Sequence, residues 1–262
     1  MRLEVISRHP PQGPARPAPL LFVHGAWHGA WCWDEHFLGY FAALGWDCHA
    51  LSFRGHGQSQ GTTRFALVRD YVEDLRAVIA QLPRPPILIG HSLGGLVVRK
   101  HIESARPPAA VLLAPLPVCG TTPLALRFAR SHPSHFILAN LTLDLRRVVR
   151  PESLCREMFF SDTLPEELFR KYYGLIGGES FLAYLDMCLS FKRPAPAAFP
   201  MLVLGAANDR VFTVDEIKKT AQAYGAECHI FDDMAHDMML EPGWERVAKR
   251  MAGWLEGGAE RE

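Results

Sequence analysis

The segment GHSLGG, residues 90–95, places the hydroxyl of Ser92 between two bulky side chains and surrounds it with glycines. The preceding PPILI predicts a short buried strand, and the residues after the serine have apolar positions at helical spacing. A strand that becomes a helix within about two residues makes a strained turn, where Gly90 and Gly94 avoid side-chain clashes. We therefore expect Ser92 to project as a nucleophile, beside helix N–H groups that favour negative charge. The alternative is a glycine-rich turn whose serine has no catalytic role.

A serine nucleophile needs a general base, and histidine is the first choice because it titrates near neutral pH. Of the twelve histidines, His236 in DDMAHDMML is the best placed, because it follows the last predicted strand. A loop at that point reaches over the carboxyl-terminal edge of a parallel sheet. His24, His56 and His91 also lie near glycine-containing motifs, but we expect them to be structural or to line a pocket wall.

The base in turn needs an acid that fixes its tautomer and stabilises the imidazolium. Asp209, in LGAANDRVF, follows a predicted strand and lies between the serine and the histidine, which produces the chain order serine, aspartate, histidine. An ordinary surface aspartate at an Asn-Asp turn is the alternative. Asp232, Asp233 and Asp237 are expected to be too near the histidine in sequence to approach its ring from the far side.

The oxyanion of an acyl-transfer intermediate needs two fixed hydrogen-bond donors. One is the backbone N–H of the residue after the nucleophile, which here is Leu93. The second is expected from the loop after the strand at 19–25, where VHGAWHGAW offers the Ala26 N–H and Gly25 lets the backbone approach closely. Loss of one such donor typically costs about 2.7–4 kcal/mol of transition-state stabilisation.

Short apolar strands alternate with helical patterns along the chain, which predicts a parallel sheet with helices on both faces. The expected fold class is therefore α/β, with a mostly parallel, doubly wound sheet. The clearest helix is expected over residues 65–82, and a capping box of Thr213 and Glu216 predicts another that ends near Gly225. Strands are expected over residues 3–7, 19–25, 47–53, 86–90, 109–114, 200–206 and 227–233.

Residues 116–199 interrupt this alternation, because they contain no convincing strand and are rich in Leu, Phe, Met and Tyr. The stretch is too long for a structureless loop. We expect a helical cap, inserted into an α/β core that is formed by residues 1–115 and 200–262. An ordinary run of helices packed on the sheet is the alternative.

Within the expected cap, the sequence predicts one helix, two candidate pocket residues and a basic surface. A helix is expected to begin near Pro165 and to end near Gly174. Phe136 and Phe181 are candidates for the wall of a pocket beneath the cap. Three basic residues are expected on a solvated face rather than against an anionic substrate, namely Arg146, Arg147 and Arg150.

The 262-residue chain carries 28 basic and 28 acidic residues, so its formal net charge is zero. Nothing in this balance favours nucleic acid or an anionic membrane as a partner. No apolar run approaches the ~18–20 residues that span a bilayer, and the polar, proline-rich start does not resemble a secretory signal. The six cysteines are scattered, so we expect reduced thiols in a cytoplasmic protein. No histidine or cysteine cluster has metal-ligand spacing, and we expect neither a metal nor a cofactor.

Five motifs occur in the order HGAWHGAWCW, FRGHGQS, GHSLGG, NDRVF and AHDMM, and together they resemble those of the α/β-hydrolase superfamily. The resemblance covers essentially the whole chain and is weakest in the cap. The doubled His-Gly-Ala-Trp phrase is similar to the branch that contains plant methylesterases and hydroxynitrile lyases. The resemblance implies a catalytic triad and an oxyanion hole, formed by Ser92, His236 and Asp209 and by the N–H groups of Ala26 and Leu93.

Two positions depart from the lyases, which carry a threonine after the first histidine of that phrase and a lysine after the catalytic histidine. Here Gly25 and Asp237 occupy these positions, so the lyase hydroxyl and its cation for cyanide are both missing. These departures argue for hydrolysis. Dehalogenases and epoxide hydrolases of this superfamily carry aspartate at the turn, so Ser92 excludes the chemistry of those two classes.

These features favour a serine hydrolase that cleaves a carboxylic ester of a small, largely apolar substrate through an acyl-enzyme intermediate. Trp27, Trp31 and Trp33 could line its pocket or lie in the core. One alternative is a cofactor-free C–C hydrolase or lyase that uses the same triad. The other is a non-catalytic protein that binds a small apolar ligand. The expected partner is a small-molecule ester, with no nucleic acid and no membrane.

Overall fold

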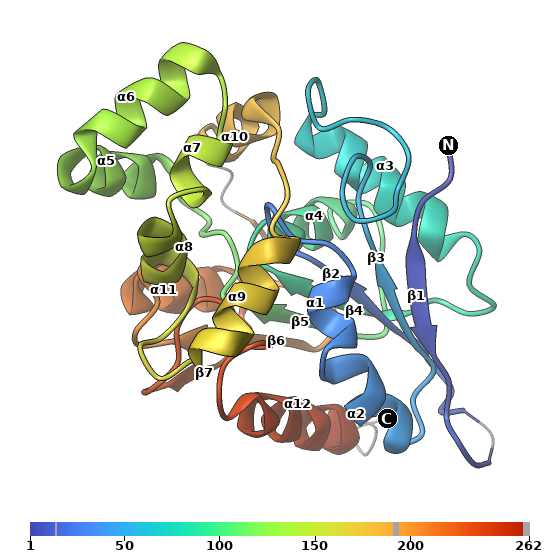
Figure 1. Ribbon diagram of the computed structural model, residues 1–262. Coiled ribbons are helices and arrows are strands. Elements are labelled where there is room, and N and C mark those ends of the chain that lie inside the picture. Colours follow the sequence, from blue (N-terminus) through green and yellow to red (C-terminus); the bar gives the residue numbers. More distant parts are fainter. Residues whose placement is uncertain (14, 191–193, 259–262) are drawn as a thin grey trace.

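The structure is a computed structural model that describes residues 1–13, 15–190 and 194–258. Within these residues, seven strands form one sheet in the order β1-β3-β2-β4-β5-β6-β7, with helices on both faces (Figure 1). The strands are β1 (Val5–Arg8), β2 (Leu20–Val23), β3 (Cys48–Leu51), β4 (Ile87–His91), β5 (Ala110–Leu113), β6 (Met201–Ala206) and β7 (Glu227–Phe231). Neighbouring strands are parallel except for β1 and β3. The expected α/β class with a mostly parallel sheet is confirmed.

The strands inside the sheet are fully buried, whereas those at its edges are partly exposed. Strands β2 to β6 contain only buried residues, as parallel strands do when helices cover both faces. Strand β7 has three exposed residues and lies at one edge, and the half-exposed β1 lies at the other. The apolar core therefore surrounds the central strands, and a site on this sheet is expected at their carboxyl ends.

The order of the strands determines which face each helix covers. From β2 to β3 the chain moves in one direction, through α1 (Trp31–Asp34) and α2 (Phe37–Ala43). From β3 onward it moves the other way, through α3 (Val68–Ile79) and α4 (Leu93–His101). Because parallel crossovers are right-handed, the two directions place their helices on opposite faces. Helix α12 (Trp244–Gly258) packs against α2, and α3 packs against α4 (Figure 1).

Strands β2 and β4 are neighbours whose connections leave in opposite directions, so a crevice opens between the loops that follow them. Val23, the last residue of β2, pairs with Gly90 in β4. The loop that begins at His24 and the turn at Ser92 therefore emerge side by side. Ligands of open α/β sheets bind at such a switch point, so the topology alone indicates where the site lies.

Between β5 and β6, the described residues form helices and no strand. These helices are α5 (Thr122–Ser131), α6 (Pro133–Thr142), α7 (Arg146–Val149), α8 (Glu152–Phe159), α9 (Glu166–Leu175) and α10 (Phe181–Cys188). Helices α5 and α6 pack against each other on the outer side of the group (Figure 1). The group is joined to the core where the Gly177 N–H donates to the Trp27 carbonyl at 2.8 Å and the Tyr71 hydroxyl donates to Glu179 at 2.6 Å. The division into a core and a cap at residues 116 and 199 stays a prediction.

Two expected helices differ slightly from the observed ones. The helix expected over residues 65–82 spans Val68–Ile79, because the Asp70 carboxylate accepts the Leu67 N–H and caps the helix there. The helix expected to end near Gly174 continues through Leu175. Sequence patterns locate the apolar stripe of a helix well, but its ends depend on such individual capping contacts.

The predicted capping box is confirmed at the start of α11 (Val214–Tyr224). The Thr213 hydroxyl accepts the Glu216 N–H at 3.3 Å, and the Glu216 carboxylate accepts the Thr213 N–H at 2.8 Å. The helix ends at Gly225, whose φ of 64° lies in the left-handed region that favours glycine. Because Asp209 lies shortly before this helix, the capping box also stabilises the loop that carries the expected acid.

Within the described residues, no helix is both long enough and apolar enough to cross a membrane. The six cysteines are free thiols, and Cys32, Cys48 and Cys155 are buried. Burial raises the pKa of the Cys155 thiol to about 12 and also raises the pKa values of the other two. These three cysteines therefore stay protonated near neutral pH and pack as small apolar side chains.

Replacing Thr213 by alanine removes the hydroxyl that accepts the Glu216 N–H. We expect Thr213→Ala to lower the free energy of unfolding by about 0.5–2 kcal/mol, measured by urea denaturation. Ser134→Ala is a suitable control, because Ser134 is exposed and its change should stay within about 0.5 kcal/mol. An equal loss in the free energy of unfolding in both variants would contradict a stabilising role for the capping box.

Candidate active site

Ser92 lies between β4 and α4 with a φ of 51° and a ψ of −116°, a conformation that is strained for a residue other than glycine. A Cβ atom on Gly94 would lie 2.3 Å from the Val23 carbonyl oxygen, and one on Gly90 would lie 2.7 Å from the Gly94 carbonyl oxygen. Neither position can hold a larger residue without moving backbone. The sequence expectation of a tight strand-to-helix turn at Ser92 agrees with this geometry.

Backbone hydrogen bonds hold the strained turn in place. The Ser92 N–H donates to the Leu113 carbonyl at 3.1 Å, at the end of the neighbouring strand β5. The Ser92 carbonyl accepts the N–H groups of Gly95 and Leu116 at 3.0 and 3.1 Å. These contacts come from two adjacent elements, so the surrounding fold maintains the conformation and aims the hydroxyl outward.

His236 and Asp209 are hydrogen-bonded to each other, with 2.8 Å between Nδ1 and Oδ2. The other carboxylate oxygen of Asp209 accepts the N–H groups of Val211 and Phe212 at 2.7 and 2.9 Å. A carboxylate can only accept, so Nδ1 of the ring is the donor and Nε2 faces away from the acid. The alternative acid Asp233 instead forms an ion pair with the exposed Arg246.

Further contacts fix the backbone of the histidine loop. The Asn208 N–H donates to the Met234 carbonyl at 3.0 Å, which joins the loops of the acid and of the histidine. His91 is buried, and its Nε2–H donates to the His236 carbonyl at 3.1 Å. The rings of His91 and His236 lie 4.8 Å apart between centroids. Because His91 directly precedes Ser92, this contact brings the serine and the histidine to the same place.

The Ser92 hydroxyl itself has no hydrogen-bond partner among the described residues. It is nevertheless at the surface of a cavity, with the residue 9% exposed. Hydrogen bonds between a nucleophile and its base are often long without substrate and tighten in the reacting complex. The arrangement therefore brings the three expected residues into one site, with the serine–histidine contact left to form there.

The expected oxyanion donors, Ala26 and Leu93, line the same cavity as Ser92. In the part of the chain that the structure describes, neither N–H donates to any protein acceptor. A Cβ atom on Gly25 would lie 3.1 Å from the Ser92 Cβ and 2.8 Å from Nδ1 of His91. Glycine at this position therefore lets the backbone of the Ala26 loop approach the serine.

The cavity at Ser92 has an almost entirely apolar wall. Helices α5 and α6 contribute Leu124, Phe128 and Phe136, and the β2 loop contributes Trp27. Thr121 and Asn140 add polar groups, and no charged side chain of the described residues lines the cavity. The site can therefore accommodate an uncharged apolar group, whereas a free carboxylate would find no cation.

The structure separates the tryptophans and phenylalanines that the sequence left open. Trp27 lines the cavity, Trp33 is fully buried in the core, and Trp31 stacks between His28 and Tyr172. Phe136 lines the cavity, but Phe181 does not. The direction in which each side chain points decides whether it lines the cavity or packs elsewhere. Arg146, Arg147 and Arg150 are exposed, as expected for a solvated face, and Arg146 pairs with Asp144.

Sequence reasoning did not identify His28 and assigned Asp237 no role. Nδ1 of His28 lies 2.7 Å from the Ala26 carbonyl, and Nε2 lies 2.9 Å from the Asp237 carboxylate. Burial lowers the pKa of His28, but the charge and hydrogen bond of Asp237, together with the Ala26 carbonyl and the charge of Glu179, raise that pKa overall. Burial raises the pKa of Asp237, but the charge and hydrogen bond of His28, together with smaller effects of His91 and His236, lower that pKa overall. The repeated His-Gly-Ala-Trp phrase was the available signal for His28.

The other histidines near the motifs have structural contacts. The His24 Nδ1–H donates to the Gly25 carbonyl at 2.7 Å, and its Nε2 accepts the Phe53 N–H at 3.0 Å, so the ring is neutral. Burial lowers the pKa of His24 well below its usual value. His56 lies 3.3 Å from the buried Glu179. These contacts agree with the expected structural roles.

The described residues contain one group with possible metal-ligand spacing, formed by His91, His236 and Asp237, whose ligand atoms lie within 4.8 Å of one another. Each residue already takes part in a hydrogen bond described above. His91 binds the His236 carbonyl, His236 binds Asp209, and Asp237 binds His28. The cluster is therefore explained as a hydrogen-bonded network behind the serine.

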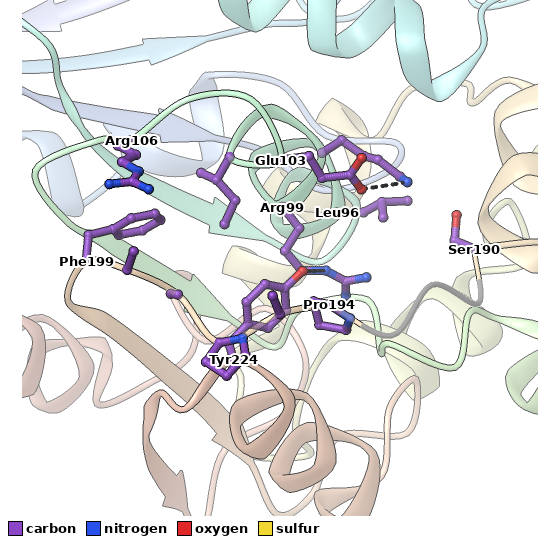
Figure 2. Close-up of a pocket in the computed structure, with 14 residues that line it drawn as sticks. Leu96, Arg99, Glu103, Arg106, Ser190, Pro194, Phe199 and Tyr224 are labelled. Atoms are coloured by element: carbon purple, nitrogen blue, oxygen red, sulfur yellow. Dashed lines mark hydrogen bonds and ion pairs between the residues drawn. The ribbon is translucent and has the colours of Figure 1, made fainter.

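A second hollow lies against α4, and none of the expected site residues lines it (Figure 2). Its wall includes Arg99, Tyr224 and Phe199. The Arg99 guanidinium donates to the Tyr224 hydroxyl at 3.1 Å and also to the Leu116 carbonyl. These contacts hold Arg99 as a buried structural cation between α4 and α11.

Acid should destabilise the protein through its buried neutral histidines. Burial lowers the pKa of His91 to about 3, whereas an unfolded chain protonates this residue near its ordinary value of about 6.5. The unfolded state therefore binds more protons between these values, and the free energy of unfolding should fall as the pH drops from about 6.5 toward 3. His24, whose pKa is also lowered, adds to this fall. Each histidine contributes up to about 1.4 kcal/mol per pH unit.

Urea denaturation at several pH values between 7 and 4 measures this dependence. His91→Asn should be less stable at pH 7 but should show a shallower fall, because one titrating group is gone. A free energy of unfolding that does not change over this range would contradict the assignment, and so would an unchanged slope in the variant.

Comparison with known proteins supplies a family for this geometry. A family model described as "Alpha/beta hydrolase family" matches residues 20–250, a range that contains every expected site residue. The chain is 26% identical to a pheophorbidase of Raphanus sativus over 230 residues, which are 85% of this chain and 81% of that protein. It is 35% identical to methylesterase 2 of Arabidopsis thaliana over 85 residues, which are 31% of this chain and 32% of that relative.

A structural comparison agrees with the family match. An esterase from Exiguobacterium antarcticum has a TM-score of 0.73 to this chain, with 97% of this chain and 95% of the other covered. The sequence identity in that comparison is 16%, so the likeness concerns the fold. Together with the curated relatives, it confirms the resemblance to α/β hydrolases and to plant methylesterases that the motifs indicated.

Proposed function

The chain belongs to the α/β hydrolase family, and from this premise we propose that it is a carboxylic ester hydrolase that works through a serine acyl-enzyme. The observation that carries the proposal is the Asp209–His236 hydrogen bond beside the strained turn of Ser92. A protein that only binds a ligand needs none of these three groups together. The similarity to a methylesterase of Arabidopsis thaliana supports ester cleavage.

The first half of the reaction acylates the serine. Nε2 of His236 takes the proton of the Ser92 hydroxyl while the oxygen attacks the ester carbonyl. Asp209 keeps the proton on Nδ1, so that Nε2 is free to act as the base, and it stabilises the imidazolium that forms. The imidazolium then returns the proton to the departing alcohol.

The negative charge of the tetrahedral intermediate is assigned to the N–H groups of Ala26 and Leu93. Both lie on rigid backbone beside the serine and have no protein acceptor within the described chain, so they are free to bind an oxyanion. Leu93 is also the first residue of α4, where the helix dipole favours negative charge. In the second half of the reaction, His236 activates water, which releases the acid and restores Ser92.

The apolar cavity indicates the kind of ester. Its wall contains no charged side chain, so the proposed substrate has an uncharged acyl or alcohol group that is largely apolar. Residues 116–199 are proposed as a cap, because α5 and α6 supply much of this wall above the serine. Such a cap would exclude water while the ester reacts.

Carbon–carbon lyase chemistry is less well supported. Gly25 provides no hydroxyl at the position where the lyases carry threonine. Asp237 is fully buried and paired with His28, so it offers neither a cation nor a free group to a small anion such as cyanide. No specific contact favours the binding-protein alternative.

A fluorophosphonate probe tests the proposed nucleophile, because only an activated serine reacts with it quickly. We expect the wild-type protein to be labelled at Ser92 and Ser92→Ala to remain unlabelled. Equal labelling of wild type and Ser92→Ala would contradict the whole triad.

Asp209→Asn should fold but lose roughly 10⁴-fold in kcat with a p-nitrophenyl ester, because the histidine takes the wrong tautomer.

An ester series of increasing acyl length tests the cavity. Each buried CH₂ contributes roughly 0.8 kcal/mol of binding, so kcat/KM should rise with length until the chain fills the cavity and then fall. Phe136→Ala enlarges the wall and should move the optimum to longer chains. Phe181→Ala is the matched control and should leave the optimum unchanged, because Phe181 does not line the cavity. A value of kcat/KM that ignores chain length would argue against this pocket.

A further inference from the structure

One buried ion pair has no part in the mechanism described above. Nε2 of His28 lies 2.9 Å from Oδ2 of Asp237, and the two side chains are 1% and 0% exposed. Removing two charges from water costs free energy, and apolar residues of similar size are often as stabilising in such a place. Stability alone therefore does not explain the pair. Its position in the site indicates another role.

The hydrogen-bond partners define the charge of His28. Its Nδ1 faces the Ala26 carbonyl, and its Nε2 faces the Asp237 carboxylate. A carbonyl oxygen and an ionised carboxylate can only accept hydrogen bonds, so both ring nitrogens carry protons. His28 is therefore an imidazolium inside the protein, in contrast to the neutral ring of His24 nearby.

The pair joins two loops that lie far apart in the sequence but must act together. At one end, His28 binds the carbonyl of Ala26, and the N–H of the same residue is a proposed oxyanion donor. The other end is Asp237, the residue directly after the proposed base His236. His28 and Asp237 are 209 residues apart, so no local structure sets the distance between these two groups.

We propose that the His28–Asp237 ion pair positions the Ala26 N–H and the His236 ring relative to each other during ester cleavage. This inference rests on the proposed function. Both residues are positioning residues, because they are buried and contact the Ala26 carbonyl and each other, so they act through Ala26 and His236. The contact between the Asp237 N–H and the Phe159 carbonyl, at 3.0 Å, also fixes the acid end of the pair to helix α8.

The direction of the pair matches the charges that develop in the reaction. The cationic ring of His28 lies beside Ala26, where the oxyanion forms. The anionic Asp237 lies beside His236, which becomes positive when it accepts the serine proton. A fixed dipole in a dry site stabilises this separation of charge without reorganising at the moment of reaction.

The surroundings keep the pair dry. The ring of Trp31 stacks on His28 with 5.4 Å between centroids, and Phe159 meets it edge-on at 5.6 Å. Titratable groups also face the pair from the neighbouring elements. They are His24, His91 and Glu179 around His28, and His91, His236, Cys32, Cys155 and Glu241 around Asp237.

Steady-state kinetics of His28→Gln, Asp237→Asn and the double variant test the proposal with a p-nitrophenyl ester. We expect kcat to fall roughly 10- to 100-fold in each, because misplacement by about 1 Å can cost about 100-fold. KM should change less than about threefold, because the cavity wall is untouched. The double variant should lose no more than the worse single variant, because both remove the same contact.

Asp74→Asn is the matched control. Asp74 is a buried carboxylate, 2% exposed, whose Oδ1 lies 2.7 Å from a guanidinium nitrogen of Arg54. Neither residue lines the cavity at Ser92. Replacing Asp74 also removes the charge of a buried carboxylate from an ion pair and should lower stability, but it should leave kcat unchanged. A loss of kcat in Asp74→Asn equal to that in Asp237→Asn would show that any buried pair matters equally, which would overturn the positioning role.

The pH profile separates positioning from general stability. His28 must stay protonated to hold both partners, so kcat should decline on the alkaline side as this ring loses its proton. Asp237→Asn removes the charge that favours the protonated ring, so its residual activity should decline at lower pH than that of the wild type. An alkaline decline at the same pH in both proteins would overturn the proposal.

Nitrogen NMR of the folded wild-type protein tests the premise without any variant. The His28 ring should show two protonated nitrogens at neutral pH, and its contact with Trp31 identifies its signals. A neutral tautomer would overturn the inference even if the variants fail to fold. Fluorophosphonate labelling of the wild type distinguishes a failure of this inference from a failure of the proposed function. Labelling at Ser92 with unchanged kcat in both single variants overturns only this inference, whereas absence of labelling overturns the proposed function.

Discussion

The close approach of strands β2 and β4 at their carboxyl ends is the constraint on which the rest of the site depends. A Cβ atom on Gly94 would clash with the Val23 carbonyl and one on Gly25 would crowd Ser92, so neither position has room for a further methyl group. This contact places the strained serine beside the backbone that supplies the Ala26 N–H. The strain persists because β5 and the segment after it hold the Ser92 backbone from the other side.

Behind this contact, histidines at neighbouring positions differ in charge. His24 has one donor and one acceptor as partners and is neutral, whereas His28 has two acceptors and is charged. His91 is neutral because burial lowers its pKa to about 3. In a dry interior, the partners and burial decide the protonation state, and the backbone places those partners. The polar side of the site is therefore organised before any substrate arrives.

The polar groups and the apolar wall come from different parts of the chain. Loops at the edge of the sheet carry Ser92, Asp209 and His236, which rigid strands hold in place. The helices between β5 and β6 supply Leu124, Phe136 and other side chains around the cavity. Catalytic geometry demands rigid positions, whereas the range of accepted ligands depends on the shape of the wall. Substitutions in these helices can thus alter the substrate without disturbing the polar groups.

The sequence by itself determined the features that depend on local patterns. Apolar runs located all seven strands, glycine spacing located the turn at Ser92, and the capping box located the start of α11. The order of motifs singled out Asp209 and His236, whose side chains meet in the structure. Each of these signals lies within a few residues, where backbone sterics and hydrogen bonding act directly.

Only the tertiary structure decided the contacts between distant segments. Proximity in sequence argued against Asp237 as the acid for His236, but it could not reveal that Asp237 pairs with His28, on a loop at the other end of the chain. Similarly, composition could not distinguish Phe136 from Phe181 or Trp27 from Trp33. The physical reason is that a side chain's surroundings depend on how whole elements pack, and packing brings together residues that no local rule connects.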